Sequence, residues 1–158
     1  SKCMDAQIGH EKTLTGLLPA LAGTRMIYGM GMIDMGMAVS YEQLLIDAEI
    51  VRMFKRAEKG ITVNEDTLAL DVITAVGPAG NFLTQRHTLK HMRNEISTAR
   101  LIDRKSYSAW EKEGSMDIVQ RANREARRIL AEHRPEPLAP EIISKIDAII
   151  AEAEKGKF

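Results

Sequence analysis

The spacing of apolar residues predicts a helix, a short strand and a flexible loop at the start of the chain. From Asp5 the apolar residues recur at three- and four-residue intervals, which is typical of one face of a helix, and Gly23 ends the pattern. Arg25–Tyr28 is a short β-branched and aromatic run between glycines, so we predict a buried parallel strand there. The apolar positions of the helix are Ile8, Leu14, Leu17, Leu18 and Leu21.

The segment from Gly29 to Met37 interleaves glycines with methionines. Glycine gives the backbone freedom, and thioether side chains adapt to irregular surfaces. Methionines more often simply fill a core, but five of the nine in this chain fall between Met26 and Met37. A helix, a buried strand and a glycine-rich loop form the repeating unit of an α/β barrel, whose loops carry the binding groups.

A long helix is predicted from Tyr41 to Lys59. Ser40 and Gln43 form a capping-box pattern before it, and Gly60 ends it. Two apolar faces indicate that this helix is sandwiched between neighbours.

Polar residues of this helix fall on two stripes. Glu49, Arg52 and Arg56 are interpreted as a solvated, ion-paired face. Asp47 lies between the apolar faces, where a partly buried carboxylate with a structural hydrogen bond is expected.

The remainder of the chain is predicted to be helical segments joined by loops. Asn64 caps a helix to about Val76, where Gly77-Pro78 stops it, and Thr84 starts a helix through Arg93. The segment 94–104 is expected to be an extended connection. Three further helices follow: one capped by Ser106 and containing Trp110, one capped by Ser115, and one that begins at Pro140 after the break at Pro135 and Pro137.

Composition excludes several classes of function. The 22 basic and 22 acidic residues balance, so bulk charge implies neither a nucleic-acid nor an anionic-membrane partner. No apolar run is long enough for a membrane span, and no signal peptide is recognisable. The single cysteine, Cys3, fits a reducing compartment, so we expect a cytoplasmic protein.

His87 and His91 have the i, i+4 spacing that can hold a metal ion on one helix face. Metal sites of this kind need a carboxylate and a third ligand, yet Thr88 follows His87 and no acid lies between the pair. From the sequence we therefore predict no metal site.

Seven segments carry a resemblance to a known family. They are DAQIGHEKTLTGLLPALAG, IYGMGMIDMGM, SYEQLLIDAEI, NEDTLALDVI, VGPAGNFL, HTLKHMR and DRKSYSAWEKEGS. In this order and spacing, they resemble the carboxyl-terminal third of the trimethylamine:corrinoid methyltransferases over nearly the whole chain.

The resemblance implies an α/β fold, the carboxyl-terminal part of a (β/α)8 TIM barrel that is α-rich with few strands in this segment. Residues 1–62 would form the final barrel units with the Gly/Met-rich loop, and residues 63–158 a helical extension. It also implies transfer of a methyl group from trimethylamine to the cobalt of a cognate corrinoid protein. The corrinoid belongs to that partner, and this chain would bind no cofactor directly.

The start of the chain bears on the branch of the family. His10 stands where many members have tyrosine, and His10-Glu11 resembles the trimethylamine branch, which carries pyrrolysine just upstream of the DAQ motif. Lys2 lies at or next to that position, where betaine-type members have an ordinary lysine. An in-frame amber codon read as a stop would explain the abrupt start, and sequencing the DNA upstream of Ser1 tests this hypothesis.

The expected chemistry selects the candidate site residues. The amine must leave as a neutral molecule, so its nitrogen must be held in a cationic form beside carboxylates and a polarisable apolar lining. Ordinary roles compete with each assignment: exposed helix charge for Glu11, turn acid for Asp34 and first-turn acid for Glu42. The candidates are catalytic Lys2, His10 and Glu11, substrate-binding Gln7, Tyr28, Asp34 and Glu42, and corrinoid-facing Met30, Met32 and Met35.

Two alternative functions remain open. One is a pyrrolysine-independent methyltransferase acting on glycine betaine or another quaternary amine. The other is a helical module that docks the corrinoid protein without chemistry of its own. In the primary interpretation we expect a homo-oligomer, and we expect the isolated segment to be inactive because most barrel strands are absent from it.

Overall fold

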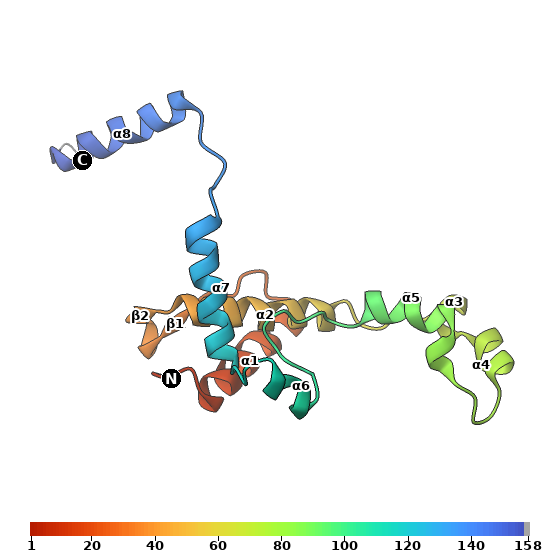
Figure 1. Cartoon of the computed structure of the whole chain (residues 1–158). Helices are drawn as coiled ribbons and strands as arrows, with labels where there is room; N and C mark the ends of the chain where they lie inside the picture. Colours follow the sequence, from red (N-terminus) through yellow and green to blue (C-terminus); the bar gives the residue numbers. More distant parts are fainter. Residues whose placement is uncertain (157–158) are drawn as a thin grey trace. The chain divides into compact units, whose positions relative to one another are not determined.

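The computed structural model describes residues 1–156 as a mostly helical chain with one short pair of strands (Figure 1). It divides into two compact units, Ser1–Arg127 and Arg128–Phe158. The helices are α1 (Ala6–Leu21), α2 (Tyr41–Glu58), α3 (Glu65–Leu68), α4 (Leu70–Val76), α5 (Arg86–Glu95), α6 (Tyr107–Lys112), α7 (Ile118–Glu132) and α8 (Pro140–Glu154); the strands are β1 (Met32–Ile33) and β2 (Ala38–Val39).

The centre of the first unit is α2, against which α1 packs. Both helices begin at side-chain caps: Asp5 accepts from the Ile8 amide at 3.1 Å, and Ser40 accepts from the Gln43 amide at 3.1 Å. Each cap satisfies an amide that the helix itself leaves without a partner. The buried core joins α2 to the 94–104 connection and α7 through Ile46, Ile50, Phe54, Leu101 and Ala122.

The predicted buried strand at Arg25–Tyr28 is wrong. This segment is irregular and exposed, with Met26 and Tyr28 each 79% exposed. A parallel strand needs partner strands to satisfy its backbone groups, and residues 1–156 offer none beside it. The pairing that does form is antiparallel, between β1 and β2, with Met32 opposite Val39 and Ile33 opposite Ala38.

The predicted capping box of α2 forms only in part. Ser40 caps the helix, but the Gln43 side chain donates to Asp47 at 2.7 Å instead of returning to Ser40. The Ser40 amide instead donates to the Gly31 carbonyl at 2.9 Å, which attaches the Met-rich loop to the start of α2.

Glu49 is buried, which corrects the prediction that it lies on a solvated face. Its side chain is 1% exposed and accepts from the Arg100 and Leu101 amides at 2.8 and 3.0 Å. Arg52 completes the arrangement with an ion pair at 2.7 Å. The 94–104 connection therefore lies across this face of α2. Its buried amides need hydrogen-bond acceptors, and the Glu49 carboxylate provides one.

Three other boundaries differ from the sequence prediction. Ala69, with φ +50°, separates α3 from α4, so Asn64 caps a single turn rather than a helix to Val76. The helix α5 begins at Arg86, because Phe82–Thr84 forms a 3₁₀ turn. The cap of α7 is Asp117, whose carboxylate accepts from the Gln120 amide at 2.7 Å, whereas the predicted cap, Ser115, lies in a turn with φ +52°.

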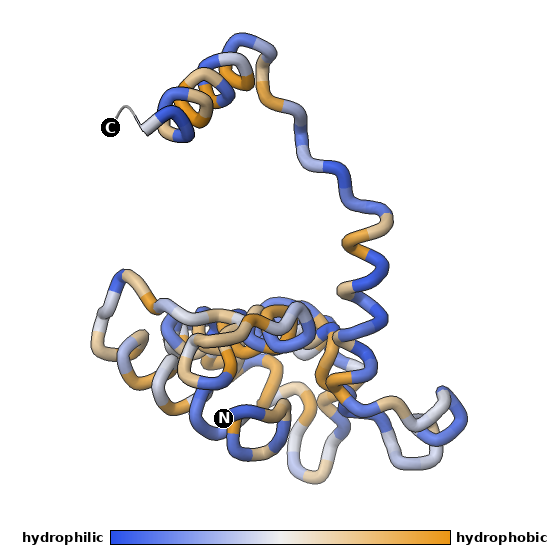
Figure 2. Tube along the Cα trace, turned by 90° about the vertical axis from the view of Figure 1, so that its left-hand side faces the viewer, coloured by the Kyte–Doolittle hydropathy of each residue, from blue (hydrophilic) through white to orange (hydrophobic). Residues whose placement is uncertain are grey.

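The second unit contains α8, which begins at Pro140 as predicted. Apolar and polar residues alternate along it (Figure 2). The apolar residues Ile142, Ile143, Ile146, Ile149 and Ile150 are all exposed. Within residues 1–156, no helix combines the length and the apolar character needed to cross a membrane.

Candidate functional site

An open groove with a volume of about 390 Å³ lies between α1 and α2. The chain from Thr24 to Met30 runs along it and contributes Tyr28. Close approach of the two helices at Gly16 forms part of its wall, since Phe54 packs directly over that glycine. The apolar part of the lining comprises Pro19, Met26, Ile27, Met30, Ile50, Val51 and Phe54.

A buried carboxylate, Asp47, forms the polar end of the groove. One of its oxygens accepts from the Gly31 amide at 2.8 Å, and the other accepts from the Gln43 side chain at 2.7 Å. Lys12 pairs with it at 3.1 Å and also donates to the Gly29 carbonyl at 2.6 Å. Asp47 and Lys12 together therefore attach the Met-rich loop to both helices.

The position of the loop also requires glycine at Gly31. Its φ of +76° is in the region that favours glycine, and a Cβ atom there would lie 3.0 Å from Leu44 Cβ. The loop backbone can therefore approach α2 closely enough for its amide to reach Asp47.

The electrostatics of the groove are balanced. Asp47 is the one carboxylate among the described lining residues, and Lys12 already compensates its charge. Exposed aromatic surface at Tyr28 remains, and an aromatic face attracts a quaternary or protonated amine. The groove could therefore contact one side of an ammonium group. Because Lys12 already compensates Asp47, a negative charge to balance the ammonium would have to come from outside the groove.

Of the predicted site residues, the structure places Tyr28 and Met30 in the groove. Met32 is half-buried on β1. Asp34 and Met35 lie in the turn between the strands, both with positive φ, and Met35 is 98% exposed. The turn presents its thioether to solvent, outside the lining of the groove.

A second group of predicted residues lies at the start of α1. Gln7 donates to the Glu11 carboxylate at 2.5 Å, and the Ser1 amino group donates to it at 2.9 Å. These hydrogen bonds lower the pKa of Glu11 below its ordinary value, and the bond from Gln7 has the largest effect. Lys2 contributes a weaker Coulombic effect in the same direction, and His10 is exposed on the same helix.

Glu42 has a different position from the other candidates. Its carboxylate accepts from the Ser40 hydroxyl at 2.7 Å and from the Asn123 side chain at 2.6 Å. These hydrogen bonds lower the pKa of Glu42, and the bond from Ser40 has the largest effect. The residue joins the start of α2 to α7 and does not line the groove.

Sequence reasoning missed Lys12 and Phe54 as groove residues, and it gave Asp47 only a structural role. The signal for Asp47 was present, because an acid between two apolar helix faces must find partners when it is buried. Lys12 carried no such signal in the sequence, where its neighbour Glu11 was chosen as the site residue. Only the fold brings the Lys12 ammonium group to Asp47.

Comparison with known proteins decides the family. The sequence model described as trimethylamine methyltransferase matches residues 1–156. The chain belongs to this family. Its curated relatives include the trimethylamine methyltransferase MttB of Desulfitobacterium hafniense, 47% identical over 98% of this chain. Trimethylamine methyltransferase MttB1 of Methanosarcina mazei is 41% identical over 99% of it.

A relative named for a different substrate is also similar to the chain. The glycine betaine methyltransferase of Desulfitobacterium hafniense is 42% identical over 99% of the chain. The chain spans about 31% of the length of the two trimethylamine methyltransferases and 32% of the glycine betaine enzyme. The match therefore covers nearly the whole of this chain and about a third of each relative.

Proposed function

We propose that this chain is the carboxyl-terminal part of a methyltransferase that moves a methyl group from trimethylamine to the cobalt of a corrinoid protein. The observation that carries the proposal is the match of residues 1–156 to the trimethylamine methyltransferase family. The groove beside Tyr28 supports it, because it joins aromatic and apolar surface to a compensated polar end. The corrinoid enters as a substrate carried by the partner protein.

In this proposal the chain completes a (β/α)8 barrel. Residues 1–62 would close the barrel, and the helices from residue 63 would extend it. A longer protein would supply the second carboxylate that the groove lacks.

The roles proposed for the candidate residues come from the expected chemistry, and the groove itself contains only Tyr28 and Met30 of them. Tyr28 holds the cationic nitrogen against its ring, while His10 and Glu11 manage the proton at the upstream end of α1. Met30, Met32 and Met35 form the wall that meets the corrinoid ring. By the family resemblance, Lys2 would lie at or next to the catalytic position.

A chimera tests the proposal. Residues 1–156 of this chain replace the corresponding third of the Methanosarcina mazei relative, and methyl transfer to its reduced corrinoid protein is followed by the absorbance change at cobalt. We expect transfer from trimethylamine. We also expect Tyr28→Ala to lower the rate about tenfold while Tyr28→Phe retains most of it, because the ring supplies the interaction.

The same assay contains the controls. The parent relative must be active beside the chimera, and circular dichroism must show that the chimera is folded. A folded chimera that transfers no methyl group from either amine would refute the proposal. For the isolated chain we expect binding to the corrinoid protein without turnover, and turnover by the isolated chain would contradict the missing-barrel interpretation.

Glycine betaine is the second candidate substrate, because a betaine enzyme is 42% identical to this chain. A betaine already carries its positive charge, so it needs no protonation before methyl transfer. Supplying glycine betaine to the same chimera distinguishes the two: faster transfer from glycine betaine than from trimethylamine would assign the chain to that branch.

The proposal includes a homo-oligomer in the cytoplasm. The exposed isoleucine stripe of α8 supports self-association, because an apolar stripe of this length gains free energy when it is covered. The exposed Cys3 thiol is consistent with a reducing compartment. Light scattering of the purified chain measures the oligomeric state.

A further inference from the structure

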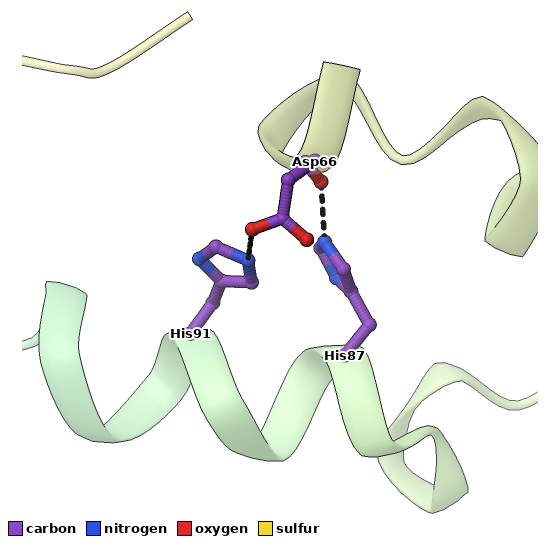
Figure 3. Close-up of side chains that lie close together, drawn as sticks. All are labelled: Asp66, His87 and His91. Atoms are coloured by element: carbon purple, nitrogen blue, oxygen red, sulfur yellow. Dashed lines mark hydrogen bonds and ion pairs between the residues drawn. The ribbon is translucent and has the colours of Figure 1, made fainter. Parts of the chain in front are cut away.

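Two histidines and an aspartate meet between α3 and α5, away from the groove (Figure 3). His87 and His91 lie one turn apart on α5, with ring centroids separated by 4.2 Å. Asp66, in the first turn of α3, points its carboxylate toward them. The potential ligand atoms of the three residues all lie within 4.8 Å of one another.

The contacts within this cluster show what holds it together. An oxygen of the Asp66 carboxylate lies 3.2 Å from His91 Nε2 and accepts from the Lys90 ammonium at 2.8 Å. His87 Nε2 lies 2.6 Å from the Asp66 carbonyl oxygen. The hydrogen bond from Lys90 is the main reason that the pKa of Asp66 lies below its ordinary value.

We propose that Asp66, His87 and His91 form a binding site for a divalent transition metal of the zinc class. Two imidazoles and a carboxylate are a ligand set that zinc uses when it keeps one position open. The carboxylate that is missing from the sequence around His87 comes instead from a separate helix. The i, i+4 pair already presents both rings on one side of α5.

Metal binding requires only local rearrangement. The ligand atoms must close to the spacing of a tetrahedral shell, and Lys90 must release the carboxylate oxygen that it shares with His91. If His87 binds through Nε2, its contact with the Asp66 carbonyl oxygen must also break. The side chains of Lys90 and Asp66 are 58% and 51% exposed, so this ion pair contributes little free energy and a metal ion displaces it readily. The bound ion would hold α3 on α5, so its expected consequence is stabilisation of this part of the chain.

Titration of the whole chain with zinc chloride, followed by calorimetry, tests the proposal. We expect one zinc ion per chain and a higher midpoint of thermal unfolding when zinc is present. Asp66→Asn and His91→Ala should each weaken binding by about tenfold or more, because each removes a ligand. Lys90→Met should tighten binding, because it removes the cation that competes for Asp66.

The variants also distinguish a metal site from an ordinary ion pair. His133→Ala removes a histidine outside the cluster and should leave zinc affinity unchanged. Circular dichroism without zinc checks that each variant keeps its helices. If His91→Ala does not fold, Lys90→Met still tests the proposal, because it retains all three ligands. Equal zinc affinity in the unmodified chain and in an Asp66→Asn/His91→Ala double variant would overturn the proposal. So would a folded Lys90→Met variant that binds zinc more weakly.

Discussion

Gly16 lies where Phe54 of α2 packs directly against α1 beside the groove. A Cβ atom built there would lie 2.4 Å from Phe54 Cε2, and the Phe54 ring is itself buried in the core. The ring is only 6% exposed, so moving it to make room for a methyl group would disturb its contacts in the core. Glycine at this position therefore determines how near the two helices lie.

We predict that Gly16→Ala destabilises the chain by about 1–3 kcal/mol through overpacking. Gly9→Ala is the matched control on the same helix, since a Cβ atom there has no neighbour within 4 Å. It should stabilise the chain by about 0.5–1 kcal/mol, because alanine favours the helix. Urea unfolding of both variants measures the difference, and equal stability would contradict the close approach at Gly16.

Individual acids show where sequence reasoning at this scale stops. The helical period correctly placed Asp47 between the apolar faces of α2. The same period assigned Glu49 to solvent, yet Glu49 is buried because the Arg100 and Leu101 amides, 51 and 52 residues further along, bond to it. Local periodicity gives a direction on the helix and carries no information about which distant segment covers it.

At the scale of elements, the caps at Ser40, Asn64 and Ser106 were predicted correctly, whereas the predicted cap of α7 was wrong. Asp117 and Gln120 bond reciprocally, with the Asp117 amide donating to the Gln120 side chain at 2.9 Å and the Gln120 amide donating back at 2.7 Å. Ser115, two residues earlier, has an equally good capping side chain. It lies in a turn with positive φ after Gly114, which moves the start of α7 beyond its reach.

Asp117→Ala should therefore cost about 1 kcal/mol of stability and some helicity at the start of α7. Ser115→Ala should change stability by much less, because the Ser115 side chain caps no helix. Thermal unfolding followed by circular dichroism compares the two. A larger loss for Ser115→Ala would restore the cap predicted from the sequence.

The hydrogen bonds by which Glu42 joins α2 to α7 should make the free energy of unfolding depend on pH. Its pKa is lowered in the folded chain by Ser40 and Asn123, relative to an unfolded value of about 4.3. The unfolded chain thus binds a proton more readily, so Glu42 stabilises the fold above that unfolded value. The contribution is lost as the pH falls through the lowered folded pKa.

We expect the difference in unfolding free energy between the unmodified chain and Glu42→Gln to be greatest near pH 7. The difference should shrink as the pH falls below about 4.3 toward the lowered folded pKa. Denaturant unfolding across this range measures it. Asn123→Ala removes one of the two donors and should reduce the pH-dependent part, whereas a difference independent of pH would show that Glu42 acts through packing alone.

At the scale of the whole molecule, the buried core cluster of the described residues takes no member from α8. A chain ending at Arg134 keeps α7 and lacks α8. Its midpoint of thermal unfolding should differ from that of the longer chain by less than about 2 °C, because the core of the first unit is intact. A fall of about 5 °C or more in calorimetry would show that α8 supports that core.

Most helices of the chain were predictable, because their apolar periods and caps are local properties of the sequence. The predicted strand at Arg25–Tyr28 failed for the opposite reason: a strand exists only through partners, and residues 1–156 provide none next to it. The groove was found only in part, through Tyr28 and Met30, since Lys12 and Asp47 become neighbours only when α1 docks on α2.

The attachment of the Met-rich loop has an evolutionary consequence. Asp47 and Lys12 hold the loop by its main chain, at the Gly31 amide and the Gly29 carbonyl, and use none of its side chains. Mutations at Met30, Met32 or Met35 can therefore alter what the loop touches without loosening its anchorage. Related proteins can therefore vary these three side chains while the backbone framework of the loop stays unchanged.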